Sequence, residues 1–570
     1  MSKPIFAGKT AYFQARNGVW QREGNRNAQE HSYVDAKEYR MLESVRSCKD
    51  VSLYSAELLA LQGDWPAPDY LSPLRANLLR PFLAKIRSGT VLELGGGCGA
   101  LTRFLGETGA EVLAVESSAR RSSIIAERCR DLPNVTVLTE QIESLELEQK
   151  FDVVTLIDFL ELAQGSESSK DALQGLLELA TSLLADNGVL ILSVANQLGL
   201  KYFCRPEDKH LERPMFGVND AGLMNAAWDC SRAALEEKFK RVGLSSIELF
   251  VPCPDDKAPV SIVYPGGFGA AAHEAGWDAA ALLANASVHA RQQSELPLYS
   301  VEMTLQTLAR NGLAQSLANT FLFALGRQSL PIDKTVLAAH YGFQRPARFA
   351  KEKQFILDAG AIWSRKRSTA DTASISDAEW IVEPYQAGHR WSELLLEIIN
   401  RPGWTVAQIS EWADFWVKSL LAQRPVTNDH AIAELHGFTH LLPSRYFDAT
   451  PFNLVKHADG SGGFFNLEWT FSTAVPVEFV VLRGLFLSFE RLTCCENPAL
   501  QTSDKLFELA LDVMEKSGLS IDIEGGDLEL FVGLFNAFQN QMQGQPEASA
   551  NQSVKNLSVA VLPVRISRCN

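Results

Sequence analysis

Short apolar runs alternate with helix-like patterns through the first half of the chain. The runs are TVLELGG, EVLAVES, VTVLTE, FDVVTLID and GVLILSVA, and helix patterns lie between them. Short runs without polar alternation are typical of strands that are buried on both faces. The rhythm therefore predicts a doubly wound parallel sheet of the α/β class.

Further elements can be predicted down to single residues. SPLRANLLRPFLAKI predicts a helix with Ser72 as N-cap and Pro73 at its first position. SRAALEEKFKRVG predicts a helix that ends at Gly243. SSIELFVPCPDD and APVSIVYP predict two strands around a turn of Pro and Asp. VEMTLQTLARNGLAQSLANTFLFALGR is predicted to be helical.

The chain is long enough for several domains. Its 570 residues are too many for one hydrophobic core. A Gly- and Ala-rich stretch follows the α/β pattern, and a second set of short strands then leads into amphipathic helices. The predicted divisions are an N-terminal extension, an α/β domain, a helical connector, an α+β domain and a tail, at residues 1–69, 70–265, 266–329, 330–540 and 541–570.

Composition and charge restrict the partners. The chain is 46% hydrophobic and 21% charged, as is usual for a soluble protein. Its formal net charge of -15 argues against a nucleic-acid backbone as the main partner. No apolar run is long enough for a membrane span. The N-terminal segment MSKPIFAGKTAYFQARNG has no apolar signal core, so we expect a cytoplasmic protein.

The strongest chemical signal is the glycine-rich segment VLELGGGCGALTRFL. A buried strand runs into Gly95, Gly97 and Gly99, and a helix follows. Glycine lets the backbone turn sharply and approach a ligand, and the helix N-terminus offers unpaired N–H groups. No G-K-[ST] follows, so the segment is not a phosphate-binding P-loop.

The cofactor of this turn can be argued from its neighbours. Gly95-x-Gly97-x-x-Ala100 formally fits a nicotinamide turn. S-adenosylmethionine is favoured by the G-x-G-x-G spacing and by Glu93, whose carboxylate suits the ammonium of a methionine moiety and would repel a pyrophosphate. Glu116 ends the next strand, where an acid takes ribose hydroxyls, and fits either cofactor. A glycine turn without any ligand is the third interpretation.

Through these residues, the chain from about 70 to 265 resembles the class I S-adenosylmethionine-dependent methyltransferases. LELGGGCG is similar to their first motif, AVESS to the second and FDVVTLIDFLELA to the fourth. The resemblance implies a Rossmann-like sheet of seven strands. It also implies S-adenosylmethionine as the cofactor. It implies further that Gln141, just after Glu140, lies near the adenine. The implied cofactor-binding residues are Glu93, Gly95, Gly97, Gly99, Glu116, Gln141 and Asp158.

Two later segments narrow the resemblance. NQLGLKYFCRPEDKH and CPDDKAPVSIVYP resemble bacterial methyltransferases of surface-glycan and flagellar-glycan gene clusters, and YLSPLRANLLRPF is similar to the helix before their first motif. This subgroup implies that the acceptor is a sugar hydroxyl on a glycan or glycan precursor, or another small molecule. It also implies proteins of a glycosylation pathway as possible partners.

A hydroxyl acceptor needs a base as well as in-line alignment with the methyl group. The candidates follow the strands, because ligands bind at the carboxyl ends of such sheets. Asp158 follows VVTLI directly, and His210 lies in the loop after GLKYF. Each has an ordinary interpretation too, as a helix N-cap for Asp158 and as a solvated loop residue for His210. The further candidates are Glu161, Glu207 and Asp208, with Tyr202 and Phe203 as possible pocket residues.

The segment YFDATPFNLVKHADGSGGFFNLEW has the spacing of a phosphotransferase site. Asp448 and Asn453 are five residues apart, and a hairpin leads on to Asn466 and Glu468. Residues 330–540 thereby resemble the aminoglycoside-phosphotransferase and kinase-like group. The resemblance implies ATP and Mg²⁺, with Asp448 as the catalytic residue. It implies metal ligands at Asn453, Asn466 and Glu468 and a phosphate-binding lysine at Lys366, with Lys353 as second choice.

This second site departs from the family pattern at two positions. The family's His before the catalytic Asp is replaced by Tyr446, and its metal-binding Asp by Asn466. A neutral amide is a poorer Mg²⁺ ligand than a carboxylate. Three interpretations follow: a kinase-like fold with weak or no phosphotransfer, an active kinase, and an unrelated helical domain.

The expected function is S-adenosylmethionine-dependent O-methylation of a sugar or glycan precursor, with a kinase-like domain that binds or phosphorylates the acceptor. The alternative is a scaffold or recognition protein of a glycosylation pathway, with a catalytically dead kinase-like module.

Overall fold

The computed structural model divides the chain into two compact units. Unit 1 comprises Met1–Ala275 and Asn311–Glu383, and unit 2 comprises Gly276–Arg310 and Pro384–Asn570. The residues that the structure describes are 12–15, 17–22, 35–61, 70–87, 89–158, 172–204, 218, 231–289, 298–342, 347–370, 372, 379–425, 435, 437–468, 474–492, 494–499 and 505–543.

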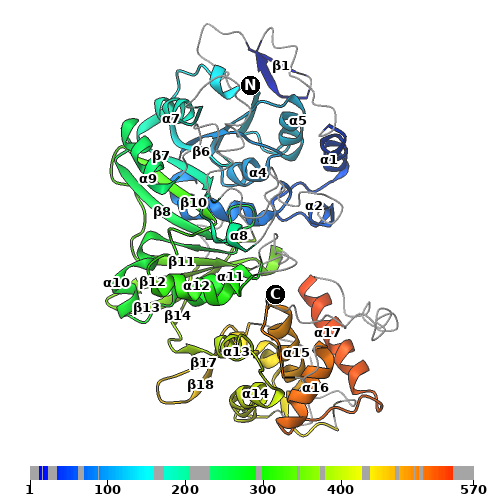
Figure 1. Ribbon diagram of the computed structural model, residues 1–570. Coiled ribbons are helices and arrows are strands. Elements are labelled where there is room, and N and C mark those ends of the chain that lie inside the picture. Colours follow the sequence, from blue (N-terminus) through cyan, green and yellow to red (C-terminus); the bar gives the residue numbers. More distant parts are fainter. Residues whose placement is uncertain are drawn as a thin grey trace. The chain divides into compact units, whose positions relative to one another are not determined.

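Unit 1 is built on one mixed sheet of fourteen strands (Figure 1). The strand order is β1-β2-β5-β4-β3-β6-β7-β10-β8-β9-β11-β12-β13-β14. The strands are β1 Tyr12–Gln14, β2 Trp20–Arg22, β3 Thr90–Leu94, β4 Glu111–Glu116, β5 Val135–Thr139, β6 Phe151–Leu156, β7 Leu184–Ala195, β8 Ser246–Cys253, β9 Ser261–Val263, β10 Thr320–Gly326, β11 Val336–Tyr341, β12 Lys351–Asp358, β13 Ala361–Ser368 and β14 Ile381–Pro384.

The middle of this sheet carries the predicted α/β pattern. Strands β5, β4, β3, β6 and β7 pair in parallel, whereas β10 is antiparallel to both of its neighbours, β7 and β8. The α/β class is therefore confirmed. The sheet is larger than the seven strands that the resemblance implied.

Helices cover both faces of the sheet. They are α1 Asp35–Ser47, α2 Ala56–Ala60, α3 Leu83–Arg87, α4 Ala100–Glu107, α5 Ala119–Arg128, α7 Ala172–Leu183, α8 Leu200–Phe203, α9 Arg232–Arg241 and α10 Ala270–Glu274. Figure 1 shows α4 and α5 on one side and α7 and α9 on the other. Short 3₁₀ helices supplement them at η3 Pro73–Leu78, η4 Arg80–Phe82, η5 Ile142–Ser144, η8 Pro265–Phe268 and η9 Ala347–Phe349.

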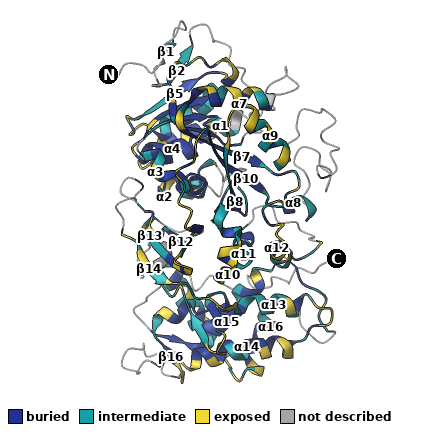
Figure 2. Ribbon diagram, turned by 90° about the vertical axis from the view of Figure 1, so that its left-hand side faces the viewer, coloured by how far each residue is buried: buried dark blue, intermediate teal, exposed yellow. Residues whose placement is uncertain are grey.

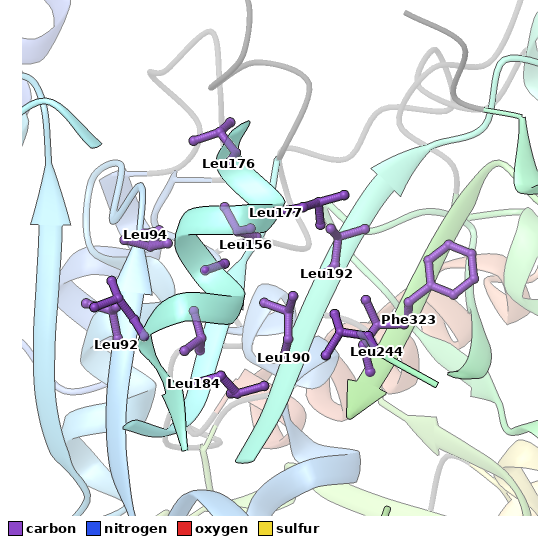
Figure 3. Packing of buried hydrophobic residues seen from close by; sticks show 14 of the residues in the cluster. Leu92, Leu94, Leu156, Leu176, Leu177, Leu184, Leu190, Leu192, Leu244 and Phe323 are labelled. Atoms are coloured by element: carbon purple, nitrogen blue, oxygen red, sulfur yellow. The ribbon is translucent and has the colours of Figure 1, made fainter. Parts of the chain in front are cut away.

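Alternate residues of each central strand serve two separate cores. Leu92 and Leu94 pack with the leucines of α7, as Figure 3 shows, whereas Val91 packs on the other face with η3, α3 and α4. A strand sends successive side chains to opposite faces, so both sets must be apolar when both faces are covered. Figure 2 shows the result, with buried residues concentrated on the sheet.

The segment at 301–327 differs from the prediction of one continuous helix. Helix α12 occupies Val301–Arg310, and β10 follows at Thr320–Gly326. All seven residues of β10 are buried, with Phe323 in one core and Leu322 in the other. An apolar run that is buried on both faces has neither helical nor alternating periodicity, so its pattern does not distinguish strand from helix.

The domain divisions also differ from the predicted boundaries. The hairpin of β8 and β9 leads to β11, which pairs with β9, and strands β12 to β14 continue the same sheet. Residues 320–383, predicted to belong to the connector and to the second domain, therefore lie in unit 1. The boundary of unit 1 is determined by strand pairing between segments that are far apart in sequence. Composition along the chain does not indicate such pairing.

The predicted helix ends at Ser72 and Gly243 agree with the structure, whereas the predicted single α-helix after Ser72 does not. Ser72 is an N-cap whose side chain accepts a hydrogen bond from Leu74 N at 3.3 Å, as predicted. The segment then forms η3 and η4 before α3, so the expected single α-helix is interrupted. Helix α9 ends just before Gly243, whose φ of 83° suits the predicted stop.

Unit 2 is mainly helical. Its helices are α11 Ala279–Ser287, α12 Val301–Arg310, α13 Trp391–Ile399, α14 Val406–Leu421, α15 Val477–Glu490, α16 Leu506–Lys516 and α17 Asp527–Gln543, with the 3₁₀ helices η12 Ser444–Asp448 and η13 Pro451–Asn453. Two small sheets accompany them, formed by β15 His389–Arg390, β17 Leu454–Lys456 and β18 Gly462–Phe464, and by β16 Leu441–Leu442 and β19 Val475–Pro476. No helix in the described parts of the chain is long and apolar enough to cross a membrane.

Two helical glycines of unit 2 differ in the space around them, and this gives a test of its packing. A Cβ at Gly484 of α15 would lie 2.3 Å from Trp416 Cη2, whereas a Cβ at Gly533 of α17 would meet nothing within 4 Å. We expect Gly484→Ala to destabilise unit 2 by about 1–3 kcal/mol. Gly533→Ala should stabilise it by up to about 1 kcal/mol, because alanine favours helix. Urea unfolding followed by tryptophan fluorescence measures both, and a stabilising Gly484→Ala would contradict the packing.

Candidate functional site

The turn between β3 and α4 has the geometry that its glycines predicted. Gly95, Gly97 and Gly99 have φ of 83°, 54° and 80°, in the left-handed region that favours glycine. Gly95 N donates to Val115 O at 2.9 Å, which ties the start of the turn to β4. A Cβ at Gly97 would meet no heavy atom within 4 Å, so the turn is open at that point.

Glu116, at the end of β4, holds this turn directly. One carboxylate oxygen accepts from Gly97 N at 2.8 Å, and the other accepts from Ser118 N at 2.9 Å. Burial raises the pKa of Glu116, and these two N–H groups oppose the rise. Each carboxylate oxygen has a second lone-pair site, so the residue can still accept from the hydroxyls of a ribose.

Glu93 is buried inside β3, with 3% of its surface exposed. It accepts a hydrogen bond from Thr102 Oγ1 of α4 at 2.6 Å. Burial raises its pKa to about 7, while the Thr102 hydroxyl lowers it. A carboxyl with this pKa is only partly ionised near neutral pH, and a cationic neighbour would ionise it fully.

The strand end beside the predicted adenine position presents two different side chains. Gln141 is exposed as the N-cap of η5, whereas Glu140 is buried at 2% exposure. Glu140 lies 3.8 Å from the guanidinium of Arg22 on β2. The amide at Gln141 is thus accessible to a ligand, and Glu140 belongs to the interior.

Asp158 follows β6 and is held between two cations. It pairs with Arg75 of η3, and its Oδ1 accepts from Lys257 Nζ at 2.5 Å. Burial tends to raise the pKa of Asp158, but Arg75 and Lys257 outweigh it and hold the pKa below its usual value. An acid in this state is a weak general base, so the ion pairs favour a positioning role. Asp158 itself has a left-handed φ of 60°.

The two segments that suggested a glycan acceptor lie next to each other. Asn319 joins them, because its Oδ1 accepts from Lys201 N of α8 at 2.8 Å and its Nδ2 donates to Pro254 O at 2.9 Å. Asp256 in the same turn accepts from Ser193 Oγ at 2.6 Å. The other acceptor-side candidates, His210, Glu207, Asp208 and Glu161, lie outside the described residues, as does the tail beyond 543.

In unit 2 the structure brings Asp448 and Asn453 together. Asn453 Nδ2 donates to the backbone oxygen of Asp448 at 2.8 Å and lies 3.3 Å from its Oδ2. Phe465 N donates to Asn453 O at 3.0 Å, which brings the hairpin end, and with it Asn466, to the same loop. The predicted spacing therefore corresponds to a real cluster within unit 2.

Asp448 also has a partner that the motif did not predict. Arg483 of α15 places its Nη2 3.0 Å from Asp448 Oδ1. Glu468 N donates to Asn466 O at 3.0 Å, and Asn466 has a left-handed φ of 56°. Among the described residues, no group of three or more His, Cys, Asp or Glu is arranged to hold a metal ion. Two neutral amides and one carboxylate are also a poor donor set for Mg²⁺.

The predicted phosphate-binding lysines lie in unit 1, apart from that cluster in sequence and in unit. Lys366 of β13 forms an ion pair with Glu383 at 2.7 Å, and Lys353 of β12 lies opposite Lys366 in the sheet register.

Several functional candidates were not visible in the sequence. Arg75 and Lys257, which hold Asp158, lie 83 and 99 residues away from it. Arg483 lies 35 residues after Asp448, in an apolar helix. The one available signal concerns Arg483, which stands in a mostly apolar helix, since a buried charge needs a partner.

The match to a known protein family lies within unit 1. Residues 69–249 match a family model described as a methyltransferase domain. This range contains the glycine turn, Glu93, Glu116 and Asp158. It covers the central parallel strands and the first half of β8, but not β10.

Individual proteins match over shorter or looser ranges. The ribosomal RNA small subunit methyltransferase A of Streptococcus pneumoniae (strain P1031) is 49% identical over 59 residues, which is 10% of this chain and 20% of that protein. The CcbJ methyltransferase from Streptomyces caelestis is 24% identical, with a TM-score of 0.21, over 26% of this chain and 60% of that one. A methyltransferase from Thermotoga maritima, described as a possible histamine N-methyltransferase, is 13% identical with a TM-score of 0.25 over 45% of this chain and 91% of that one.

The raised pKa of Glu93 predicts a pH-dependent stability. Between pH 4.5 and about 7 the unfolded carboxyl ionises while the buried one stays protonated, so the folded state loses stability as pH rises. The free energy of unfolding of the native chain should therefore fall by roughly 3 kcal/mol across this interval. In Glu93→Gln this fall should be absent. Urea unfolding at pH 5 and pH 8 measures it, with Glu111→Gln, an exposed acid on β4, as the control. An equal effect of Glu93→Gln at both pH values would contradict the raised pKa.

Proposed function

We propose that unit 1 is an S-adenosylmethionine-dependent methyltransferase. The observation that carries this proposal is the turn after β3, which has three left-handed glycines and whose Gly97 N donates to the buried Glu116 of the next strand at 2.8 Å. The match of residues 69–249 to a methyltransferase-domain model supports it independently. A P-loop function is opposed by the lack of the lysine that would follow such a turn.

The cofactor is proposed to bind along the carboxyl ends of β3, β4 and β5. Glu116 would accept from the ribose hydroxyls, the open face of Gly97 would lie against the cofactor, and Gln141 would meet the adenine. Glu93 would act through charge, because the ammonium of the methionine moiety favours ionisation of a carboxyl whose pKa is about 7. These residues supply binding and orientation, and the reactive methyl group comes with the cofactor.

The acceptor is proposed to be a sugar or glycan precursor that is methylated on oxygen. The resemblance to glycan-cluster enzymes suggests it, and Asn319, which bridges α8 and the turn at 253–257 by hydrogen bonds, supports a polar acceptor surface there. His210 remains the candidate base, since Asp158 is occupied by Arg75 and Lys257. An RNA acceptor, as the name of the streptococcal relative would suggest, is opposed by the net charge of -15.

Unit 2 is proposed to recognise the acceptor and to transfer phosphate weakly or not at all. The ion pair of Asp448 with Arg483 and the amide at Asn466 both favour binding over phosphotransfer. A role with ATP and Mg²⁺ stays the rival proposal for this unit. A scaffold in a glycosylation pathway, with cytoplasmic location and partner proteins, stays the rival for the whole chain.

Binding of S-adenosylhomocysteine to the full chain tests the methyltransferase proposal. Glu116→Gln should weaken binding about 10- to 100-fold, because it removes charge from the group that accepts from both the turn and the ribose. Glu111→Gln changes an exposed acid of the same strand and should leave affinity unchanged. Calorimetry measures both variants, and tighter binding of NAD than of S-adenosylhomocysteine would overturn the proposal.

Substitution of Asn466 tests whether unit 2 recognises a ligand or transfers phosphate. We expect no binding of ATP with Mg²⁺ to the native chain and a gain of binding in Asn466→Asp, because a carboxylate is the better Mg²⁺ ligand. Asp tolerates the left-handed φ of 56° about as well as Asn does. Asn497→Asp adds the same charge at an exposed site and serves as control. Strong binding of ATP with Mg²⁺ to the native chain would favour an active kinase instead.

A further inference from the structure

Two arginines of unit 2 lie beside Asp448, and their settings differ. Arg483 is fixed by hydrogen bonds, since its Nη2 lies 3.0 Å from Asp448 Oδ1 and its Nη1 donates to Phe447 O at 3.1 Å. Its guanidinium also lies 4.3 Å from the centre of the Phe447 ring. Arg483 therefore neutralises Asp448 and is itself held on one face by an aromatic ring.

Arg491, the C-cap of α15, is positioned by stacking alone. Its guanidinium lies 4.4 Å from the centre of the Phe452 ring, in the loop between Asp448 and Asn453. Within the described part of the chain, no carboxylate or carbonyl accepts a hydrogen bond from it, and Glu490 forms no ion pair with it. Stacking uses the flat face of a guanidinium and leaves its N–H groups, which point outward in the plane, available.

Two acids act on Arg491 through charge, and neither forms an ion pair with it among the described residues. Asp448 already pairs with Arg483, and Glu490 lies next to Arg491 in the chain without pairing with it. His289 adds no positive charge, because burial and the nearby Arg491 lower its pKa to about 4. Burial lowers the pKa of Arg491, and the nearby Arg483 lowers it further, although Asp448 and Glu490 oppose both effects. The half-buried guanidinium therefore gains from an added anion.

We propose that unit 2 binds the phosphate group of a phosphorylated acceptor at Arg491, while Arg483 neutralises Asp448. The planar fork of an arginine matches the oxygens of a phosphate, and charge-assisted bonds of this kind are the strong ones. The inference rests on the proposed recognition role of unit 2 and adds the chemical class of its ligand. It does not depend on methyl transfer in unit 1.

Calorimetry on the full chain in EDTA tests the site without metal or nucleotide. The probes are inorganic phosphate, a hexose 1-phosphate and the corresponding neutral hexose. We expect both phosphates to bind and the neutral hexose to bind at least 10-fold more weakly than its phosphate. Tighter binding of the hexose phosphate than of inorganic phosphate identifies a phosphorylated sugar as the ligand, and equal binding identifies the phosphate group alone.

Variants locate the binding at Arg491. Arg491→Gln should weaken phosphate binding 10-fold or more, whereas Arg491→Lys, which keeps the charge but loses the fork, should weaken it by about 3-fold. Arg445→Gln is the matched control, because Arg445 is exposed in the same loop region and stacks on Tyr446 at 5.2 Å. If Arg491→Gln does not fold, the comparison of Arg491→Lys with Arg445→Gln still determines whether phosphate binds at Arg491.

Three results would overturn the inference: no binding of either phosphate, equal binding of the neutral hexose, and unchanged phosphate affinity in the Arg491 variants. Binding of S-adenosylhomocysteine, measured on the same samples, reports on unit 1. Its loss in the native chain would count against the methyltransferase proposal and leave the phosphate result standing.

Discussion

The hydrogen bond from Gly97 N to the Glu116 carboxylate, 2.8 Å long, is the contact on which the site of unit 1 depends. It joins the turn after β3 to the end of β4, where the N–H of Gly95 is also bound to Val115 O. The fully buried Arg128 donates to Cys98 O of the same turn at 3.2 Å. The turn is thus held by both an acid and a cation, and its left-handed glycines have no side chain to separate the backbone from a ligand.

Half-buried acids in both units are held by arginine, and this limits the chemistry that each can perform. Asp158 is paired with Arg75 and Lys257, and Asp448 is paired with Arg483. A general base needs a pKa near the working pH, which favours a carboxyl that is raised by burial without a cationic partner. Arg75 and Lys257 hold the pKa of Asp158 below its usual value, so these ion pairs favour a positioning role for Asp158 over proton transfer.

The sequence predicted those parts of the fold that depend on neighbouring residues. The turn at 95–99, the cap at Ser72 and the stop at Gly243 follow from local backbone preferences. Strand β10 could not be predicted, because a fully buried strand has no periodicity and its pairing with β7 and β8 lies outside the local pattern. The ion pairs of Asp158 were missed for a related reason, as partners 83 and 99 residues away leave no spacing signal.

Asp158 and Asn466 share a left-handed backbone, with φ of 60° and 56°, and both come from motifs that predicted function. Among residues with a side chain, Asp and Asn tolerate this conformation best. The backbone at 466 therefore accepts either residue, and the presence of Asn there does not reflect a steric requirement. What the amide changes is charge: with Asn466 neutral, the carboxylates left at the predicted site positions are Asp448, which pairs with Arg483, and Glu468. A neutral amide is a poorer ligand for a divalent metal than a carboxylate, so Asn466 weakens the case for a magnesium site in unit 2.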